Sequence, residues 1–364
     1  MQYFLIKKKA MVTAVKPQSL KIFRHFTLLL VPGLLTIATS LTLVSCTQEN
    51  QSPTNQVSDT QTSKIKTKVL RMGYQQAGDL VRVTKVLEKR LEPLGIKVEW
   101  AQFAQGPQLM EAMNVGKIDL GNVGETPPIF AQAAGAQIAY VVGRRSDGRR
   151  SAIAVPPNSP IKTVKDIKGQ KVVFQKASAS HYFIIRALEQ VGLKYSDIQV
   201  LSIPNVEASS AFLEGKIPVW VTGDPHLARA EKLGKARVIK NAVGLDSPGG
   251  YYIGTKQFVI NNPELLRIVI EEIDKIERWA QTHPKETAKL IAPYQKLPPD
   301  VMELFISRRG YGLRAISPDL INEQQRIADY FYKNGLLPKP LNVREAMLTS
   351  EQYAAITPPT ISQK

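Results

Sequence analysis

The stretch IDLGNVGETPPIFAQAAG, residues 118–135, decides the fold class because it joins a short apolar segment to a helical one. Residues 118–123 have the length and composition of a buried strand, and residues 127–134 have those of a helix closed by Gly135. The loop between them is small and polar. A strand that passes through such a loop into a helix is the repeating unit of α/β proteins.

The same unit recurs on both sides of this stretch. The other elements expected before residue 143 are strands at 69–74, 96–103 and 138–142 and helices at 80–91 and 108–115. A second round of short strands and helices follows between residues 152 and 253, and the chain is almost all helical after Pro263. We therefore predict an α/β fold with two lobes, mostly parallel sheets and C-terminal helices.

Two crossings between the lobes are expected, near residues 143–155 and 243–253. The expected organisation is lobe 1 at residues 69–155 and 254–345, lobe 2 at 156–253, and a loose tail at 346–364. Ligands bind such sheets beyond the carboxyl ends of the strands. The cleft between the two lobes is therefore the expected binding site.

The first 45 residues have the pattern of an export signal. Six Lys and Arg residues and no acid precede an apolar run at 26–44, which leads into Leu43-Val44-Ser45-Cys46. This ending matches the bacterial lipobox, in which the cysteine is acylated and becomes the mature N-terminus. Cys46 is the only cysteine of the chain, so an internal disulfide is not open to it. An uncleaved transmembrane anchor is the alternative reading.

Residues 46–68 are expected to form a flexible tether between the lipid and the folded part, because they contain few apolar residues. The long basic segment leaves Met11 as an alternative start to Met1. The expected location is extracytoplasmic, in the periplasm, with a lipid anchor in the membrane.

The formal net charge of +17 is compatible with nucleic acid, an anionic membrane or an anionic ligand. Export argues against nucleic acid, and no basic run is interleaved with aromatic residues as a nucleic-acid groove requires. One local basic cluster contains Arg144, Arg145, Arg149 and Arg150. We expect this cluster to be a solvent-exposed loop.

Four small or polar loops open expected helices, at residues 74–79, 104–107, 124–128 and 175–181. Helix starts offer unpaired N–H groups and the positive end of the helix dipole, which favour anions. Each loop alone reads as an ordinary helix cap, with Ser178 and Ser180 as capping residues. Four of them in one two-lobed chain indicate a shared site for a small organic anion such as a sulfonate.

At these loops the chain resembles the aliphatic sulfonate-binding proteins of ABC transporters, which are related to taurine- and nitrate-binding proteins. The resemblance is carried by the segments at residues 73–75, 106–112, 114–121, 127–136, 158–164, 174–176, 180–181 and 186–188. It runs from about Leu70 to about Arg344 and is denser in the first half. It implies a periplasmic-binding-protein-like fold of type II that closes on its ligand and delivers it to ABC permease subunits.

The resemblance also implies which residues lie at or beside the ligand, namely Gln75, Glu125, Thr126, Ser178, Ser180 and His181. The other candidate ligand-binding residues are Tyr74 and Gly106 in the loops, and Trp220 and Asp224 in the 220–226 region. Alone, His181 reads as a packed histidine and Trp220 as a core residue. The expected protein is a monomeric carrier without a cofactor, serving sulfur acquisition.

Two departures from the family pattern leave the particular substrate open. Gly223 stands where relatives have a bulky aromatic ring, and Glu125 stands where they often have aspartate. Taurine, nitrate or bicarbonate is the alternative ligand, although no acidic cluster suits the calcium that sometimes assists bicarbonate. A pyrimidine-precursor-related enzyme of the same fold group is the rival class. The four histidines show no metal spacing, and no hydrolase or nucleotide-binding motif occurs, so we expect no enzyme.

Overall fold

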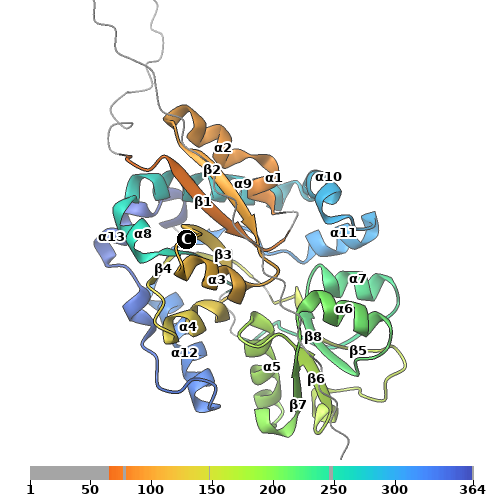
Figure 1. Cartoon of the computed structure of the whole chain (residues 1–364). Coiled ribbons are helices and arrows are strands. Elements are labelled where there is room, and N and C mark those ends of the chain that lie inside the picture. Colours follow the sequence, from red (N-terminus) through yellow and green to blue (C-terminus); the bar gives the residue numbers. More distant parts are fainter. Residues whose placement is uncertain (1–64, 77–78, 147, 246–248, 363–364) are drawn as a thin grey trace, which may run out of the picture. The chain divides into compact units, whose positions relative to one another are not determined.

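The computed structural model describes residues 65–76, 79–146, 148–245 and 249–362. The expected signal peptide, Cys46 and all but the last residues of the expected tether lie outside these residues. In the described part, the strands form two separate sheets, as expected for a two-lobed type II fold (Figure 1). No helix of the described part is long and apolar enough to cross a bilayer.

The first sheet has six strands in the order β11-β4-β10-β3-β1-β2. Its strands are β1 (Val69–Tyr74), β2 (Lys97–Gln102), β3 (Leu120–Val123), β4 (Ile138–Arg144), β10 (Tyr251–Thr255) and β11 (Leu313–Arg314). Strand β1 is parallel to β2 and β3, whereas β10 is antiparallel to β3 and β4. The sheet is therefore mixed and not mostly parallel as expected, because the chain returns to it through β10 after visiting the second sheet.

The second sheet has five strands in the order β7-β6-β8-β5-β9. Its strands are β5 (Ser151–Val155), β6 (Lys171–Phe174), β7 (Gln199–Ser202), β8 (Val219–Gly223) and β9 (Arg237–Asn241). Strand β6 is parallel to β7 and β8, and β5 is antiparallel to β8 and β9.

The helices of the described part follow the strand–loop–helix order expected from the sequence. They are α1 (Leu80–Thr84), α2 (Val86–Leu91), α3 (Gly106–Asn114), α4 (Thr126–Ala133), α5 (Ala179–Gln190), α6 (Asn205–Leu213), α7 (His226–Lys232), α8 (Lys256–Asn261), α9 (Pro263–Thr282), α10 (Pro284–Gln295), α11 (Pro299–Ser307), α12 (Pro318–Lys333), α13 (Ser350–Ile356) and α14 (Pro359–Ser362). Short 3-10 helices are η1 (Glu92–Leu94), η2 (Val164–Ile167), η3 (Tyr195–Asp197) and η4 (Val343–Ala346).

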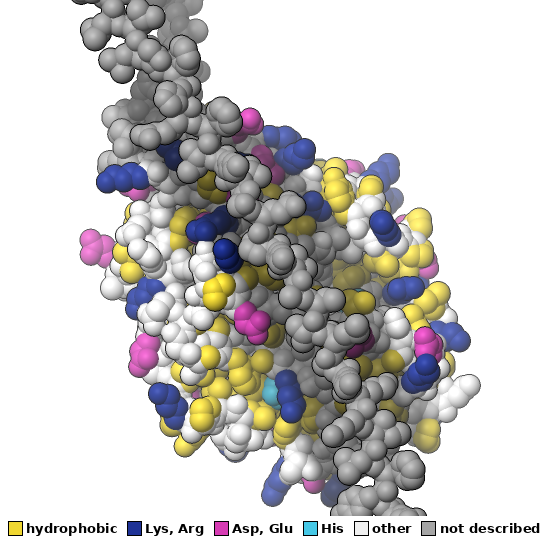
Figure 2. Space-filling view, in the orientation of Figure 1, with side chains coloured by type: hydrophobic (Ala, Val, Ile, Leu, Met, Phe, Trp, Pro, Cys, Tyr) yellow, Lys and Arg dark blue, Asp and Glu magenta, His cyan; other side chains and the backbone are white. Residues whose placement is uncertain are grey.

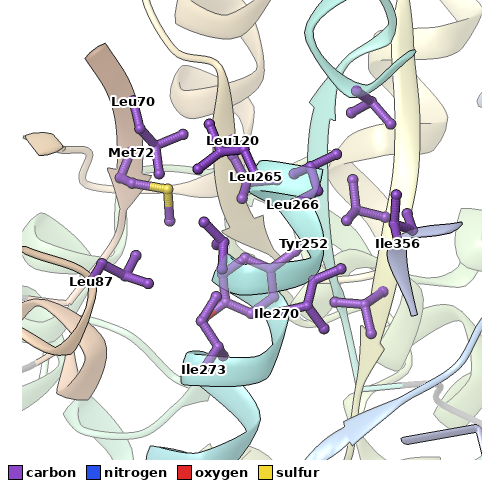
Figure 3. Packing of buried hydrophobic residues seen from close by; sticks show 14 of the residues in the cluster. Leu70, Met72, Leu87, Leu120, Tyr252, Leu265, Leu266, Ile270, Ile273 and Ile356 are labelled. Atoms are coloured by element: carbon purple, nitrogen blue, oxygen red, sulfur yellow. The ribbon is translucent and has the colours of Figure 1, made fainter. Parts of the chain in front are cut away.

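Helices cover both faces of each sheet, which is why the central strands are apolar on both sides. On one face of the first sheet, β-strand residues such as Leu70 and Leu120 pack against Leu265 and Ile270 of α9 (Figure 3). On its other face, Tyr140 and Ile253 pack in a cluster with Leu109 of α3 and Leu320 of α12. In the second sheet, α5 packs on one face and α6 with α7 on the other.

Two strands belong to the sheet of the other lobe from the one in which they were expected. Residues 151–155 were expected in lobe 1, but β5 pairs with β8 and β9 of the second sheet. Residues 251–253 were expected in lobe 2, but β10 pairs with β3 and β4 of the first sheet. The chain therefore passes between the sheets at residues 145–150 and 242–250, before these strands begin rather than after them.

Three further expectations need correction. The expected helix at 80–91 is divided into α1 and α2 by Lys85, whose φ of 56° is left-handed. The expected loose tail contains α13 and α14, because Ile356 and Ile361 are buried in the same core as α9. Order also begins before Val69, since the Lys68 carbonyl accepts a hydrogen bond from Lys97 N at 2.9 Å.

Candidate functional site

A cavity of about 280 Å³ lies where loops from both sheets meet. Its walls come from the loops after β1, β2 and β3, from the loops after β6 and β8, and from both segments that connect the sheets. Parallel strands end at the same edge of a sheet, so their following loops gather there. The cavity is small, which suits a small ligand.

Four helices of eight or more residues begin at this cavity: α3, α4, α5 and α6. The starts of α3 and α4 approach closely because residue 106 is glycine. A Cβ atom at Gly106 would lie 2.5 Å from Cγ of Pro127, closer than real Cβ contacts allow. The unpaired N–H groups and positive dipole ends of these helices make this wall favourable for an anion.

Six of the ten residues proposed from the sequence line the cavity. They are Gln75, Gly106, Glu125, Ser178, Ser180 and Asp224. The Gln75 amide is fixed by a 2.8 Å hydrogen bond from Nε2 to the Asn122 carbonyl. Burial raises the pKa of the Glu125 carboxyl group, which is 3% exposed, above its usual value.

The other four proposed residues, Tyr74, Thr126, His181 and Trp220, do not line the cavity. The Tyr74 ring packs edge-on against Trp100, with a centroid distance of 5.9 Å. Trp220 is fully buried and packs against Phe212 at 5.1 Å, and Thr126 is fully buried at the first turn of α4. Their proposed ligand contacts are therefore absent from this cavity wall, because these side chains face the interior.

His181 faces the aromatic interior between α5 and α12, away from the cavity. Its Nδ1 atom accepts a hydrogen bond from Ala177 N at 3.1 Å, and Nε2 lies 3.0 Å from the Tyr195 hydroxyl. Rings of Phe174 and Phe331 pack against it at 5.3 and 5.1 Å. Burial, with a smaller contribution from Lys176, lowers the pKa of His181 to about 3. His181 therefore holds the loop before α5 as a neutral side chain.

Ser178 was expected to cap α5 with its hydroxyl, and that expectation is wrong. Its Oγ donates a 2.7 Å hydrogen bond to the Gln175 carbonyl, and no side-chain cap bond forms at this helix start. Because Ala177 has a left-handed φ of 59°, the loop turns sharply before the helix. The first N–H groups of α5 consequently donate no hydrogen bond to the Ser178 hydroxyl.

Three arginine side chains that were not expected at the site also line the cavity, namely Arg144, Arg150 and Arg309. Arg144 and Arg309 point to the same carboxylate oxygen, Oε1 of Glu277 on α9, at 3.1 and 3.0 Å. Glu277 is 1% exposed. Burial would raise the pKa of Glu277, but the two guanidinium groups outweigh it and hold that pKa below its usual value. Two cations thus share one anion at this wall.

Arg150 differs from the other two cavity arginines because its guanidinium has no acceptor. Among the described residues it forms no side-chain hydrogen bond or ion pair, and its buried Nε is unpartnered. The group lies over the Phe305 ring at 5.7 Å. Burial, together with repulsion from Arg309, lowers the pKa of Arg150 to about 10, so it stays charged near neutral pH.

The expectation of a solvent-exposed basic loop at residues 144–150 holds only for Arg145 and Arg149, which are exposed. Arg144 and Arg150 turn inward because the segment that contains them crosses between the sheets. Their position in the sequence could have placed them at the cavity, since both lie within the crossing expected at residues 143–155. Arg309 follows α11, and no local sequence pattern marks it as a cavity residue.

Arg308, next to Arg309, forms a clasp with α7 beside the cavity. Its Nη1 and Nη2 atoms contact the two carboxylate oxygens of Glu231 at 2.5 and 3.1 Å. The Arg308 side chain is 19% exposed and that of Glu231 is 22% exposed, so water only partly screens the pair. This bidentate contact joins the C-terminal helices to a helix of the second sheet.

A second pocket of about 540 Å³ lies between the end of α4 and residues 325–345, away from the strand ends. No group of three or more His, Cys, Asp and Glu residues is placed to hold a metal ion in the described part of the chain. On the face shown in Figure 2, dark-blue Lys and Arg side chains lie apart from one another, among hydrophobic and acidic side chains. That dispersion is unlike a continuous nucleic-acid-binding stripe.

Comparisons with known proteins agree with this architecture. The family model described as NMT1/THI5 like matches residues 92–287. A relative from Escherichia coli (strain K12), named for binding aliphatic sulfonates, is 36% identical over 280 residues, which are 76% of this chain and 87% of the relative. A Bacillus subtilis (strain 168) relative with the same name is 30% identical over 286 residues, 77% of this chain and 86% of the relative.

A solved structure gives the same match in three dimensions. The alkanesulfonate-binding protein of Xanthomonas axonopodis pv. citri, bound to MOPS, superposes with a TM-score of 0.74 at 34% identity. The match covers 77% of this chain and 98% of that chain. The two-lobed fold therefore has a counterpart of known structure.

Proposed function

The chain belongs to the aliphatic sulfonate-binding proteins within the NMT1/THI5-like family, and from that premise we propose that its cavity captures a small organic sulfonate. The carrier then delivers the ligand to the permease subunits of an ABC importer for sulfur acquisition. Its relatives are solute-binding proteins, and the fold is that of a periplasmic binding protein.

The observation that carries the proposal is the unpaired guanidinium of Arg150. Arg150 is half-buried and its buried Nε has no hydrogen-bond partner, so its charge has lost part of its hydration without a protein group to replace it. A ligand anion would supply the missing partner through a charge-assisted hydrogen bond. An anion is therefore the class of ligand that gains most from this wall.

The remaining walls suit a sulfonate in particular. Its three oxygens share one negative charge, and they can accept hydrogen bonds from several directions at once. Donors are available at the start of α5, at the Ser180 hydroxyl and at the amide of Gln76. Gly223 also lines the cavity without a side chain. A Cβ added there would lie 3.2 Å from the Arg150 carbonyl oxygen, which is a tight contact, and 3.5 Å from Ser151 Oγ.

Export and anchoring belong to the same proposal. A signal at residues 1–45 and lipidation of Cys46 would hold the carrier at the outer side of the cytoplasmic membrane or in the periplasm, near its permease. Mass spectrometry of membrane-extracted protein should find a diacylglyceryl group on Cys46. A mature chain that retains Met1 or Met11 would contradict this part of the proposal.

Titration calorimetry on the purified full-length protein in mild detergent tests the ligand class. The panel contains alkanesulfonates of increasing length, taurine, nitrate and bicarbonate. We expect sulfonates to bind most tightly and Arg150→Met to weaken every sulfonate. Preference for nitrate or bicarbonate over all sulfonates would replace the proposed ligand, and a taurine optimum would narrow it to amino sulfonates.

A further inference from the structure

Asp224 holds an unpartnered, buried carboxylate oxygen beside the cavity. The residue is 6% exposed and lines the cavity at the end of β8. Its Oδ1 accepts a 2.9 Å hydrogen bond from Ala228 N and so caps α7, whereas Oδ2 is buried without a hydrogen-bond donor. Acceptor atoms are rarely left in this state unless a ligand or solvent completes them.

Asp224 and Arg150 are neighbours that do not pair with each other. Asp224 N donates a 2.9 Å hydrogen bond to the Arg150 carbonyl, which holds the two backbones side by side. Their charged groups nevertheless form no ion pair among the described residues. Asp224 Oδ1 instead lies 3.8 Å from Nη1 of Arg308, and the Asp224 side chain is fully buried. A buried anion therefore lies beside the same small cavity that the Arg150 cation lines.

The chemistry of this arrangement distinguishes between oxyanions of different charge. A sulfonate bound at Arg150 presents one charge there and an uncharged carbon on its fourth side. Sulfate has the same three oxygens but carries a second charge and a fourth oxygen. Toward the Asp224 carboxylate, that oxygen meets a like charge in a poorly hydrated cavity, where repulsion is strong.

We propose that Asp224 is a specificity-determining residue that excludes doubly charged oxyanions such as sulfate while admitting sulfonates. The inference rests on the proposed function, because it names the selectivity of the same site. It assigns the Asp224 carboxylate a role separate from its helix-capping bond, since the two functions use different oxygens.

The charge state of Asp224 makes this selectivity dependent on pH. Burial raises the pKa of Asp224 to about 6, and the opposing attraction of Arg150 and Arg308 is smaller. The other groups that face it are Glu231, whose charge raises that pKa further, and His226, whose own pKa is lowered by burial and by Arg229. Discrimination against sulfate should therefore be strong at pH 8 and weaker at pH 5.

Methanesulfonate and sulfate are the matched probes, because a methyl group replaces one charged oxygen between them. Calorimetry at pH 8 would measure both dissociation constants for the full-length parent, for Asp224→Asn and for Glu207→Gln. Asparagine retains an oxygen that can accept from Ala228 N. Glu207 is exposed on α6, so its variant makes the same change in net charge away from the cavity.

We expect Asp224→Asn to lower the ratio of the sulfate to the methanesulfonate dissociation constant by about tenfold or more, with no change in Glu207→Gln. An unchanged ratio in folded Asp224→Asn would overturn the inference and leave the proposed function standing. A parent that binds neither probe nor any longer sulfonate would overturn both. If Asp224→Asn fails to fold, the parent decides: an equal ratio at pH 5 and pH 8 would overturn the inference.

Discussion

Two arginine regions line one cavity and differ in what holds them. Arg144 and Arg309 are fixed by Glu277, whose single oxygen accepts from both at 3.1 and 3.0 Å. The Arg150 guanidinium lies over the Phe305 ring, and its buried Nε has no hydrogen-bond partner among the described residues. The first region is completed by the protein itself. In the second region, a bound ligand would supply the missing hydrogen-bond acceptor. Substitutions should therefore affect stability at Arg144 and Arg309 and ligand affinity at Arg150.

The largest effect is expected from Glu277→Gln, which removes the shared anion and leaves two buried guanidinium groups without a charged partner. Breaking a buried pair in this way costs about 3–5 kcal/mol of unfolding free energy. Chemical denaturation of the ligand-free protein would measure it. Glu271→Gln on the same helix is the control, because its pair with Lys275 is exposed and contributes at most about 1 kcal/mol. Equal losses of unfolding free energy in the two variants would show that Glu277 is not what holds Arg144 and Arg309.

Arg150→Met should change affinity rather than stability. Loss of a charge-assisted hydrogen bond weakens sulfonate binding by about 1.5–3 kcal/mol, whereas the ligand-free protein should melt no lower than the parent, since an unpaired buried charge is removed. Calorimetry and thermal denaturation together measure both effects. Arg145→Met is the control, because Arg145 is exposed in the same segment. A large drop in ligand-free stability with unchanged affinity would place Arg150 with the structural arginines.

His181 extends the comparison to a side chain whose two ring nitrogens both have partners within the protein. The unfolded histidine binds a proton near pH 6.5, whereas the folded one does so only near pH 3, so its contribution is full above pH 6.5 and is lost as pH falls. Relative to His181→Gln, the parent should lose up to about 1.4 kcal/mol of unfolding free energy per pH unit between pH 6 and 4. Parallel pH profiles for the two proteins would show that His181 is solvated. The difference between profiles cancels the opposite contribution of Asp224.

The smallest effect concerns the space beside Arg150. Gly223→Trp should favour short alkanesulfonates over bulky ones, because covering one methylene contributes about 0.8 kcal/mol. Gly223 has no left-handed φ, so backbone strain does not explain the glycine. A panel of dissociation constants for sulfonates of increasing size measures the shift. If the rank order is unchanged in a folded variant, Gly223 does not shape the ligand's surroundings.

The order of strands, loops and helix starts was predictable from the sequence. The partners that buried side chains find in distant segments were not. Apolar strands, polar loops and helix starts alternate within short windows, so the loops holding Gln75, Glu125 and Ser180 could be placed at the cavity. His181 lies next to Ser180, but each helical residue turns by about 100°, and the ring therefore faces Phe331 instead. Whether an arginine faces solvent, Glu277 or the cavity depends on contacts across more than 100 residues.

The clasp between Arg308 and Glu231 bears on how long a ligand stays rather than on how tightly it binds. It joins α7 to the segment after α11 next to the cavity, so widening the cavity at this side requires the two side chains to separate. Water and dissolved ions compete with the pair for its two charged groups and so favour its separation, because both side chains are about one-fifth exposed. The dissociation rate of a bound anion should therefore rise with ionic strength, and the carrier would release its cargo faster in salty surroundings.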